Sequence, residues 1–506
     1  MICAPGLILT PQLISDAVCA GAAAVTLKTQ LMSATLVAAG TSTLLQSTVG
    51  LRLPIMHGPA AAFLPPIYAY QTSHRCLPED EDEEWSFRLK EIAGSLMLGC
   101  LLFVIIGFTG LAGVLSRLIG PITIVPVMIL LCMSLLPLVQ DMISSHWISA
   151  VAMLMIIIMV IYLEDYPICI PGFGKFCLFG QYPLALTILI CWAICWIITF
   201  FDCESYDSPV RYDRNETRRI MEQATWLTIP YPGNIGLPTV NLGLSLAFCA
   251  SVTVDVIENL GSYDLLARVC HQRRPPKDAV NRAIVVEGLG SMLAASMGVG
   301  MGLTTYSNNI AIIQMTKVAS RRPMQVAGMF LIFLGICTKA AAVMATIPDG
   351  IIGGTMIVTV GFIAGVSLNN LQLVDLSLSR NLSIMGFSLM AGIAIPSHFE
   401  RFPIRTGHKN WDDVINMLIS IKMLVGGVIA VFLDNTVGRA TAQQRGLHFA
   451  RNSDGDQQDG SGYAYPDWFT RSVSKIPLVR SLPFMPTPDL QEQNKTSLTV
   501  NCSDKV

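Results

Sequence analysis

Charged residues are scarce in this chain. Asp, Glu, Lys and Arg make up 13% of its 506 residues, whereas a soluble domain carries about 25%. Apolar residues make up 52%, the mean hydropathy is +0.55, and long apolar runs recur from one end to the other. The shortage of charge excludes an ordinary soluble protein. The composition predicts an all-α polytopic membrane protein.

Several functional signatures are missing as well. The net charge is −2 and no basic stripe with interleaved aromatic residues is present, so we expect no nucleic acid partner. No pair among the 14 cysteines has metal-site spacing, and most of them lie inside apolar runs, where cysteine acts as a small hydrophobic residue. Neither a nucleophile–base pair nor a cleavable signal peptide is recognisable. We therefore expect no enzyme, and no cofactor or metal beyond Na⁺ as a coupling ion.

The apolar runs can be counted as membrane passes. A membrane helix needs about 20 apolar residues, and on this basis the chain has about 14 passes. They lie near residues 1–20, 31–50, 54–71, 91–117, 120–140, 147–163, 181–201, 238–268, 279–297, 303–317, 324–346, 351–374, 382–396 and 413–433. The tail, 434–506, is polar and contains proline and glycine, so we expect it to be disordered.

Basic residues orient these passes. Lys and Arg cluster after the eighth pass, at 268–277, and after the tenth, at 317–322. The positive-inside rule places both connections and both termini in the cytoplasm, and the loop 202–236 outside. Asn215 in this loop begins an Asn-Glu-Thr sequon, which predicts a glycosylation site.

The tenth pass is unusual inside. From Gly298 to Lys317 it reads GVGMGLTTYSNNIAIIQMTK, and its glycines and β-branched residues weaken a continuous helix. The pattern predicts a short extended piece followed by a half-helix, which a membrane tolerates only inside protein or beside a cavity. The third pass is also interrupted, by Pro54 and Pro59, and a short extended piece is expected there as well. These two passes correspond in two halves of seven, and paired interruptions of this kind mark the site of transporters built as a 7+7 inverted repeat.

The eighth pass carries two acids. Asp255 and Glu258 lie three residues apart and share a helical face with Ser262. Because a carboxylate inside a membrane is costly, we interpret Glu258 and Ser262 as substrate ligands and Asp255 as an ion-coupling candidate. The alternative for Asp255 is a structural pair with a lysine such as Lys339. The remaining charges near the membrane are interpreted as structural or gating pairs: Glu287, Asp375 and Arg380.

Polar residues open the half-helix of the tenth pass. Ser307 and Asn308 are expected to lie close to the substrate, and Ser307 is a second ion-coupling candidate. Asn309 is a candidate contact as well, although asparagine is a preferred helix cap and its main role is predicted to be bridging segments. Tyr306, the last residue of the extended run, completes this group.

The third pass supplies the counterpart. The N–H groups of Ala61 and Ala62 are expected to face the substrate, while His57 nearby, placed at the membrane edge, is interpreted as a packing residue. Two helix N-termini that converge from opposite directions form a positive pocket. Such a pocket suits an anionic or carbonyl-rich planar solute.

Together these motifs resemble the nucleobase–ascorbate transporter family over about residues 8–435, and in particular its animal branch of sodium-dependent vitamin C transporters. The resemblance rests on short motifs spread along the chain: Leu44-Leu45-Gln46, Arg52-Leu53-Pro54, Ala62-Phe63-Leu64, Ile229-Pro230-Tyr231-Pro232-Gly233, Glu258-Asn259-Leu260-Gly261, Val286-Glu287-Gly288, Ser320-Arg321-Arg322, Ser367-Leu368-Asn369-Asn370-Leu371-Gln372 and Ser379-Arg380-Asn381-Leu382.

The resemblance implies a fold, a mechanism and a partner. It implies a core domain that slides against a gate domain, a homodimer through the gate, and a substrate held by the acid at Glu258, by the tenth-pass half-helix and by backbone of the third pass. The implied domains are a core of 1–117 and 237–347, a gate of 118–201 and 348–434, an outer loop of 202–236 and a tail of 435–506.

The family signature in the tenth pass differs at two positions. The family has Gln, Glu or Pro, then Asn, any residue and Gly, whereas this chain has Asn308, Asn309, Ile310 and Ala311. The first position follows the substrate class in the family, with Pro in ascorbate members and Gln or Glu in nucleobase members. Asn308 matches neither class.

Three functions remain open on the sequence. The first is a sodium-coupled transporter of a small planar polar solute, with L-ascorbate as the best single choice, in the plasma membrane. The second is a transporter of nucleobases such as uracil, xanthine or urate, in which Asn308 would bind an amide edge. The third is a non-transporting regulatory or truncated member, suggested by the short first pass and the altered signature.

Overall fold

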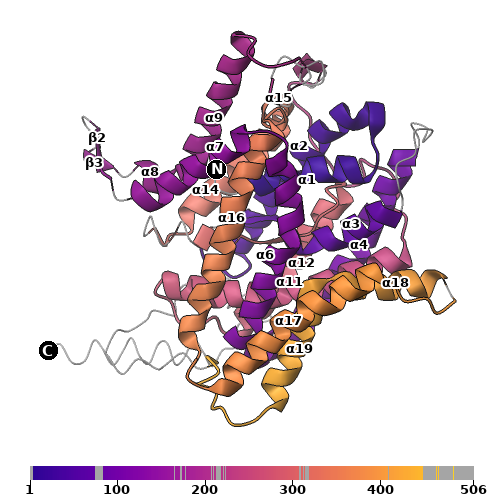
Figure 1. The fold of residues 1–506 in the computed structure, drawn as a ribbon, viewed down its shortest axis with the longest axis vertical. Coiled ribbons are helices and arrows are strands. Elements are labelled where there is room, and N and C mark those ends of the chain that lie inside the picture. Colours follow the sequence, from indigo (N-terminus) through magenta and orange to yellow (C-terminus); the bar gives the residue numbers. More distant parts are fainter. Residues whose placement is uncertain are drawn as a thin grey trace.

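Most of the chain is described by a computed structural model. The described residues are 4–73, 84–164, 166–170, 174–176, 178–206, 208, 210–211, 218–219, 221–222, 224–306, 309–310, 313, 318–407, 409–447, 463, 465 and 483. This part of the chain is mainly helical, with a few strands of three residues each (Figure 1).

The elements fall into four stretches of the chain. The first holds α1 (Ala4–Ala17), η1 (Gly21–Ala23), α2 (Ala24–Thr48), β1 (His57–Pro59), η2 (Ala61–Phe63), α3 (Leu64–Ser73), α4 (Glu84–Phe108) and α5 (Leu111–Leu118). The second holds α6 (Pro121–Ser144), α7 (Ile148–Ile157), η3 (Ile158–Tyr162), β2 (Ile168–Ile170), β3 (Gly174–Phe176), α8 (Leu178–Gln181) and α9 (Pro183–Phe200). The third holds α11 (Leu242–Val269), α12 (Lys277–Ser296), β4 (Leu303–Thr305), α14 (Arg322–Ile336) and α15 (Thr338–Ala345). The fourth holds α16 (Asp349–Asn370), η4 (Leu371–Leu373), α17 (Ser379–Arg401), α18 (Lys409–Ser420) and α19 (Lys422–Thr436).

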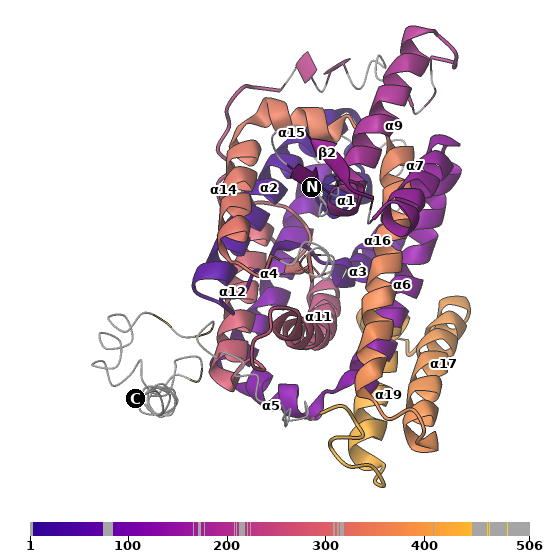
Figure 2. The ribbon, with the colours of Figure 1, turned by 90° about the vertical axis from the view of Figure 1, so that its left-hand side faces the viewer.

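These helices pack as two sets. In the first set α2 packs against α14, and α4 packs against α12 and α11; in the second, α6 packs against α16 and α19, and α17 against α19. In Figure 2, α2, α4, α12 and α14 lie on one side and α6, α16, α17 and α19 on the other. Helix α11 of the first set and helix α3 lie between these two groups. The close approach of α2 and α14 requires small residues, because a Cβ added at Gly40 would lie 2.6 Å from the carbonyl oxygen of Gly328. The first set therefore forms a tightly packed unit around α2.

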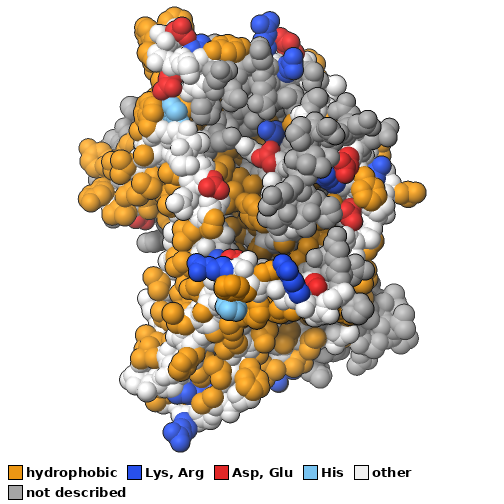
Figure 3. All heavy atoms as spheres, turned by 45° about the vertical axis from the view of Figure 1, so that its right-hand side comes forward, with side chains coloured by type: hydrophobic (Ala, Val, Ile, Leu, Met, Phe, Trp, Pro, Cys, Tyr) orange, Lys and Arg blue, Asp and Glu red, His pale blue; other side chains and the backbone are white. Residues whose placement is uncertain are grey.

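Large apolar side chains lie on the outside of the helices. Phe200, Phe333, Phe387 and Phe432, on four different helices, are all more than three-fifths exposed. Figure 3 shows hydrophobic side chains over much of one face of the molecule. A surface of this kind fits a lipid environment, since soluble monomers rarely expose large contiguous apolar patches.

The described part contains six helices that are long and apolar enough to span a membrane. It contains up to eight if two bent helix pairs count as one span each. The fourteen passes and the inverted repeat expected from the sequence are therefore not confirmed. One reason is that several expected passes are short or interrupted, since α1 has 14 residues and α3 has 10.

Three expected passes are wrong in detail because each is split. The pass at 91–117 divides at Gly110, whose φ of +78° ends α4 and starts α5. The pass at 324–346 bends by 90° between α14 and α15, and the pass at 413–433 bends by 73° between α18 and α19. The extended backbone of Ile421 separates α18 from α19.

The expectation of a fully disordered tail is also wrong in part. Residues after α19 form a turn in which Leu447 N–H donates to Ala442, and Gln444 accepts a hydrogen bond from Asp375 N–H. Tyr463 and Tyr465, further along the tail, contact the first helix set. The tail thus folds back on the helices at several points.

Candidate functional site

The two interrupted segments meet in the structure. β1 and β4 pair as an antiparallel two-stranded sheet in which His57 lies opposite Thr305 and Pro59 opposite Leu303. Ala60 N–H donates to Gly302 at 2.8 Å, and Tyr306 N–H donates to Met56 at 3.0 Å, which extends the pairing at both ends. The extended pieces predicted for the third and tenth passes are therefore present, and they form one unit.

The chain enters and leaves these strands in a way that the residues explain. Gly298 and Gly300, just before β4, have φ values of +83° and +76°, a conformation that glycine adopts at little cost. After β1, η2 begins at Ala61 and α3 follows at Leu64. The first N–H groups of a helix have no partner within it, and the predicted contact of Ala61 and Ala62 with a ligand stays a prediction.

Helix α11 holds this sheet through Asn259. Thr304 Oγ1 donates to Asn259 Oδ1 at 3.0 Å, and Thr305 N–H lies 3.4 Å from the same oxygen. The neighbouring Glu258 is buried, and its carboxylate lies within electrostatic range of Cys132 on α6. Glu258 thus lies on the helix that holds the sheet, and this helix also packs against α6 of the second set. Ser262, one turn further along, is buried on the same helix.

Asp255 is the second acid of α11. It is fully buried, and neither of its carboxylate oxygens has a hydrogen-bond partner among the described residues. Ser251 Oγ and Asn259 Nδ2, one turn before and one turn after it, are also buried and have no hydrogen-bond partner in the described part of the chain. The structural alternative, a pair with a lysine such as Lys339, is not found among the described residues, where Lys339 Nζ donates to the carbonyl of Met221.

Glu287 on α12 is the centre of a buried hydrogen-bond network. Its carboxylate accepts from Thr305 N–H and from Tyr263 O–H, both at 3.0 Å, and lies 3.8 Å from His57 Nε2. A hydrogen bond of 2.7 Å joins Ser42 Oγ to His57 Nδ1. The structural role expected for Glu287 agrees with these contacts.

His57 is expected from the sequence to be a packing residue at the membrane edge, and its side chain is fully buried in the protein. The roles of Asn259 and Tyr263 were not predicted. A usable signal was present, since both are polar residues on the same apolar helix as Glu258, within about one and a half turns of it.

The polar residues after β4 are described in part. Asn309 donates its side-chain amide to the carbonyl of Pro54 at 2.8 Å, which is the bridging role that the sequence predicts for it. The ring of Tyr306 packs so closely over Gly58 that an added Cβ there would lie 2.3 Å from it. Ser307 and Asn308 lie outside the described residues, as do Ala311 and Asn215, so their predicted roles stay predictions.

Arg380 pairs with Asp434 and not with Asp375, the acid nearest to it in the sequence. Asp434 at the end of α19 is fully buried and accepts from Arg380 at 2.9 Å and from Arg445 at 2.8 and 3.0 Å. Asp375 instead accepts from Ser377. The pair is therefore structural and ties α17 to α19 and to the start of the tail.

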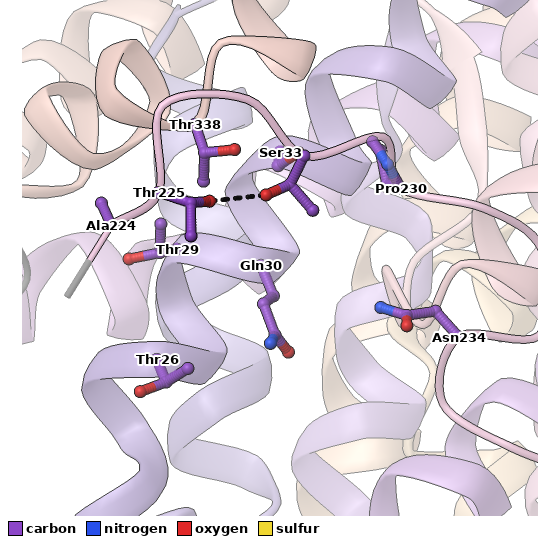
Figure 4. A pocket seen from close by; sticks show the side chains of 10 residues that line it. Thr26, Thr29, Gln30, Ser33, Ala224, Thr225, Pro230, Asn234 and Thr338 are labelled. Carbon is purple, nitrogen blue, oxygen red and sulfur yellow. Dashed lines mark hydrogen bonds between the residues drawn. The ribbon is translucent and has the colours of Figure 1, made fainter.

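A cavity of about 180 Å³ lies away from the strands. Figure 4 shows that α2, the loop 224–234 and the start of α15 line it with neutral side chains such as Thr26, Gln30, Asn234 and Thr338. None of the residues predicted for the substrate site belongs to it. The geometry of the strands and the buried acids, rather than this cavity, identifies the candidate site.

These features define a class of protein. The chain is a multi-pass membrane protein in which two interrupted segments pair beside a buried acid, and this arrangement is typical of secondary transporters. Residues 1–401 match the Permease family model Xan_ur_permease. The chain belongs to this family, and it is a transporter and not an enzyme.

Relatives agree with this assignment. Solute carrier family 23 member 1 of Rattus norvegicus is 35% identical over 475 residues, which cover 88% of this chain and 78% of the relative. Solute carrier family 23 member 2 of Homo sapiens is 34% identical, with 88% and 72% covered. Nucleobase-ascorbate transporter 2 of Arabidopsis thaliana is 29% identical, with 84% and 83% covered. Among solved structures, the transmembrane domain of the cyanobacterial bicarbonate transporter BicA matches at 16% identity and a TM-score of 0.39, over 85% of this chain and 95% of that domain.

Proposed function

We propose that this protein is a sodium-coupled secondary active transporter of a small planar polar solute, and that the solute is L-ascorbate. The observation that carries the proposal is the hydrogen bond from Thr304 to Asn259, because it holds both interrupted segments against the helix that bears Glu258. A solute between them would meet helix N–H donors and a carboxylate acceptor at once.

The chemistry of the site supports the class of solute. The helix start at Ala61 offers N–H groups and a positive dipole end to a carbonyl or enolate oxygen. Glu258 offers an acceptor to a hydroxyl or ring N–H. The resemblance to the vitamin C branch supports ascorbate, while the Arabidopsis relatives are named for nucleobases and ascorbate alike.

The buried acids support coupling to a cation. Asp255, Glu258 and Glu287 lie close together, and among the described residues no Lys or Arg forms an ion pair with any of them. A buried charge without a partner is costly, so a cation bound with the solute would stabilise the site. The unpartnered oxygens of Asp255 and Ser251 are hard ligands that fit Na⁺. Ser307 stays a further candidate ligand.

The two helix sets support an elevator-type movement. We infer that the first set is the core and the second the gate, that the gate forms a homodimer, and that the core carries the site past α6. The same proposal includes 14 passes in a 7+7 inverted repeat. It also includes cytoplasmic termini, a plasma membrane location and a glycan at Asn215.

The second candidate is a nucleobase transporter, which Asn308 favours because its side-chain amide can both donate to and accept from a base. The third is a non-transporting member, and the altered signature at Asn308 and Ala311 favours it. Both predict different transport results from the first.

One experiment separates the three. The chain is expressed in oocytes, and uptake of labelled ascorbate, uracil and urate is measured in sodium or choline medium. Sodium-dependent uptake of ascorbate that Glu258→Ala abolishes, at unchanged surface amount, supports the proposal. Uptake of bases alone supports the nucleobase transporter, and surface protein without any uptake supports the non-transporting member.

A further inference from the structure

The C-terminal tail contacts the first helix set through Tyr463, Tyr465 and Pro483. Tyr463 O–H donates to the carbonyl of Arg273 at 2.7 Å, and the Tyr463 carbonyl accepts from Arg282 at 3.3 Å. The carbonyl of Pro483 accepts from the side chain of Asn281 at 3.1 Å. We call this group of contacts the tail contact.

Tyr465 is the most firmly held of the three. Two guanidinium groups contact its ring, with the Cζ atoms of Arg52 and Arg282 each 4.6 Å from the ring centroid. Cations placed over an aromatic face in this way are attracted by the ring. Its hydroxyl donates to the carbonyl of Val49 at 2.5 Å. Burial raises the pKa of Tyr465, so the phenol stays neutral and keeps its proton for this bond.

The contacts of Tyr465 and Arg282 meet at the turn that joins α2 to β1, residues 49–54. Tyr465 binds the carbonyl of Val49, and Arg282 Nε donates to the carbonyl of Gly50 at 2.7 Å. Arg52 within the turn has a φ of +64°, a conformation that a non-glycine residue keeps only when its surroundings hold it. Tyr465 contacts the Arg52 side chain and so helps to hold it.

The same turn is bound from the side of the candidate site. The carbonyl of Pro54 accepts from Asn309, and β1 begins three residues later at His57. The turn is thus fixed at its start by the tail and at its end by the second interrupted segment. A change at Tyr465 is transmitted along only a few residues of chain before it reaches β1.

We propose that Tyr465 is a positioning residue of the substrate site: through the carbonyl of Val49 and the side chain of Arg52, the tail fixes the turn 49–54 and with it the position of β1. The expected effect of Tyr465 on transport rests on the proposed function. Its role in holding the turn 49–54 does not depend on that function. Tyr463 provides a matched comparison, because its hydroxyl binds the connection after α11 and not this turn.

Hydrogen exchange of the full-length protein tests the contact without any transport. In Tyr465→Ala, the backbone N–H groups of residues 50–53 and 55 should exchange about tenfold faster, because a hydrogen bond and two cation–π contacts are lost together. Tyr465→Phe removes only the hydroxyl and should give a smaller increase. Tyr463→Phe should leave these amides unchanged. Equal exchange in wild type and Tyr465→Ala would overturn the proposal.

Uptake kinetics test the consequence for the site. Tyr465→Ala should raise KM for the transported solute several-fold and change Vmax per surface molecule much less, with Tyr465→Phe in between. A loss confined to Vmax, or to the amount of folded protein, contradicts a positioning role. If Tyr465→Ala does not fold, Tyr465→Phe alone decides by its exchange and KM. If the wild type shows no uptake, the proposed function is wrong. The hydrogen-exchange result would still show whether Tyr465 holds the turn 49–54.

Discussion

His57 and Thr305 lie opposite each other across a two-stranded sheet, although 248 residues separate them in the chain. His57 Nε2 and Thr305 Oγ1 are 3.4 Å apart, and both lie beside the carboxylate of Glu287. The two interrupted segments are therefore one hydrogen-bonded unit. A substitution in one of them is expected to change the position of the other.

Glu287→Ala tests the support of this unit. The substitution removes the acceptor of Tyr263 O–H and the nearer acceptor of Thr305 N–H, which keeps only the longer contact of 3.4 Å to Asn259. A buried donor left without a partner costs about 1–3 kcal/mol. We expect the melting temperature of the purified protein to fall by several degrees. Glu287→Gln, which keeps an acceptor oxygen, should lose less. Melting temperatures that are equal in all three proteins would contradict this role.

Asp255→Asn tests the ion-coupling candidate. The asparagine keeps the shape of the side chain and removes a buried acid whose oxygens have no hydrogen-bond partner among the described residues, so stability without sodium should stay close to that of the wild type. Sodium should raise the melting temperature of the wild type over choline, because a ligand that binds only the folded state stabilises it. In Asp255→Asn this sodium effect should vanish. A full sodium effect in the variant would remove Asp255 from the ion site.

Gly58→Ala tests the packing between the two segments. An added Cβ would lie 2.3 to 2.6 Å from ring atoms of Tyr306, so the ring or the strand must move. We expect the KM for uptake of the solute to rise, while the amount of protein at the cell surface stays the same. Gly361→Ala is the matched control, because a Cβ at Gly361 on α16 meets no atom within 4 Å. Similar kinetics for Gly58→Ala and the wild type would show that this contact is not needed.

The sequence predicted the interrupted segments well because their signal is local. Glycines at every second position, followed by β-branched residues, weaken a helix wherever they occur, and β4 is found where this pattern places it. Pro54 and Pro59 mark the interruption of the third pass, and β1 is found there. Glu258 and Asp255 could be selected for a similar reason, since acids in an apolar helix are rare. Residue types alone were sufficient for these conclusions.

The contacts between distant elements could not be read in the same way. Nothing in the sequence near Arg380 indicates Asp434, which lies 54 residues away on another helix. The bend between α14 and α15 also depends on tertiary contacts, because Thr228 N–H donates to the carbonyl of Ile336 beside it. The tail contact at Tyr465 was hidden by a polar composition that usually indicates disorder.

Asp434→Ala tests the ion pairs that tie the start of the tail to α17 and α19. It leaves Arg380 and Arg445, both largely buried, without their carboxylate. Loss of one partner of a buried ion pair costs about 3–5 kcal/mol, so we expect a marked fall in thermal stability and in the amount of protein at the surface. Lys422→Ala is the comparison, at the opposite end of α19. Thermal stability that is equal in both variants would contradict the assignment.

Asn370→Asp tests the proposed sliding of one helix set on the other. Arg268 on α11 donates to Asn370 Oδ1 on α16 at 3.1 Å, so this hydrogen bond joins the two sets. Asn370 Nδ2 has no partner among the described residues, and its replacement by oxygen therefore breaks no hydrogen bond found there. The aspartate converts a neutral acceptor into a charged one, which strengthens the bond.

If the sets slide past each other in each transport cycle, this bond must break each time. A bond that is stronger by about 1 kcal/mol would slow the step roughly fivefold. We therefore expect a lower Vmax for Asn370→Asp at an unchanged surface amount, whereas Asn369→Asp, one residue away on α16, should leave Vmax close to the wild type. An Asn370→Asp protein with wild-type Vmax would mean that α11 and α16 keep their relative position throughout the cycle, because a strengthened contact that never breaks cannot slow transport.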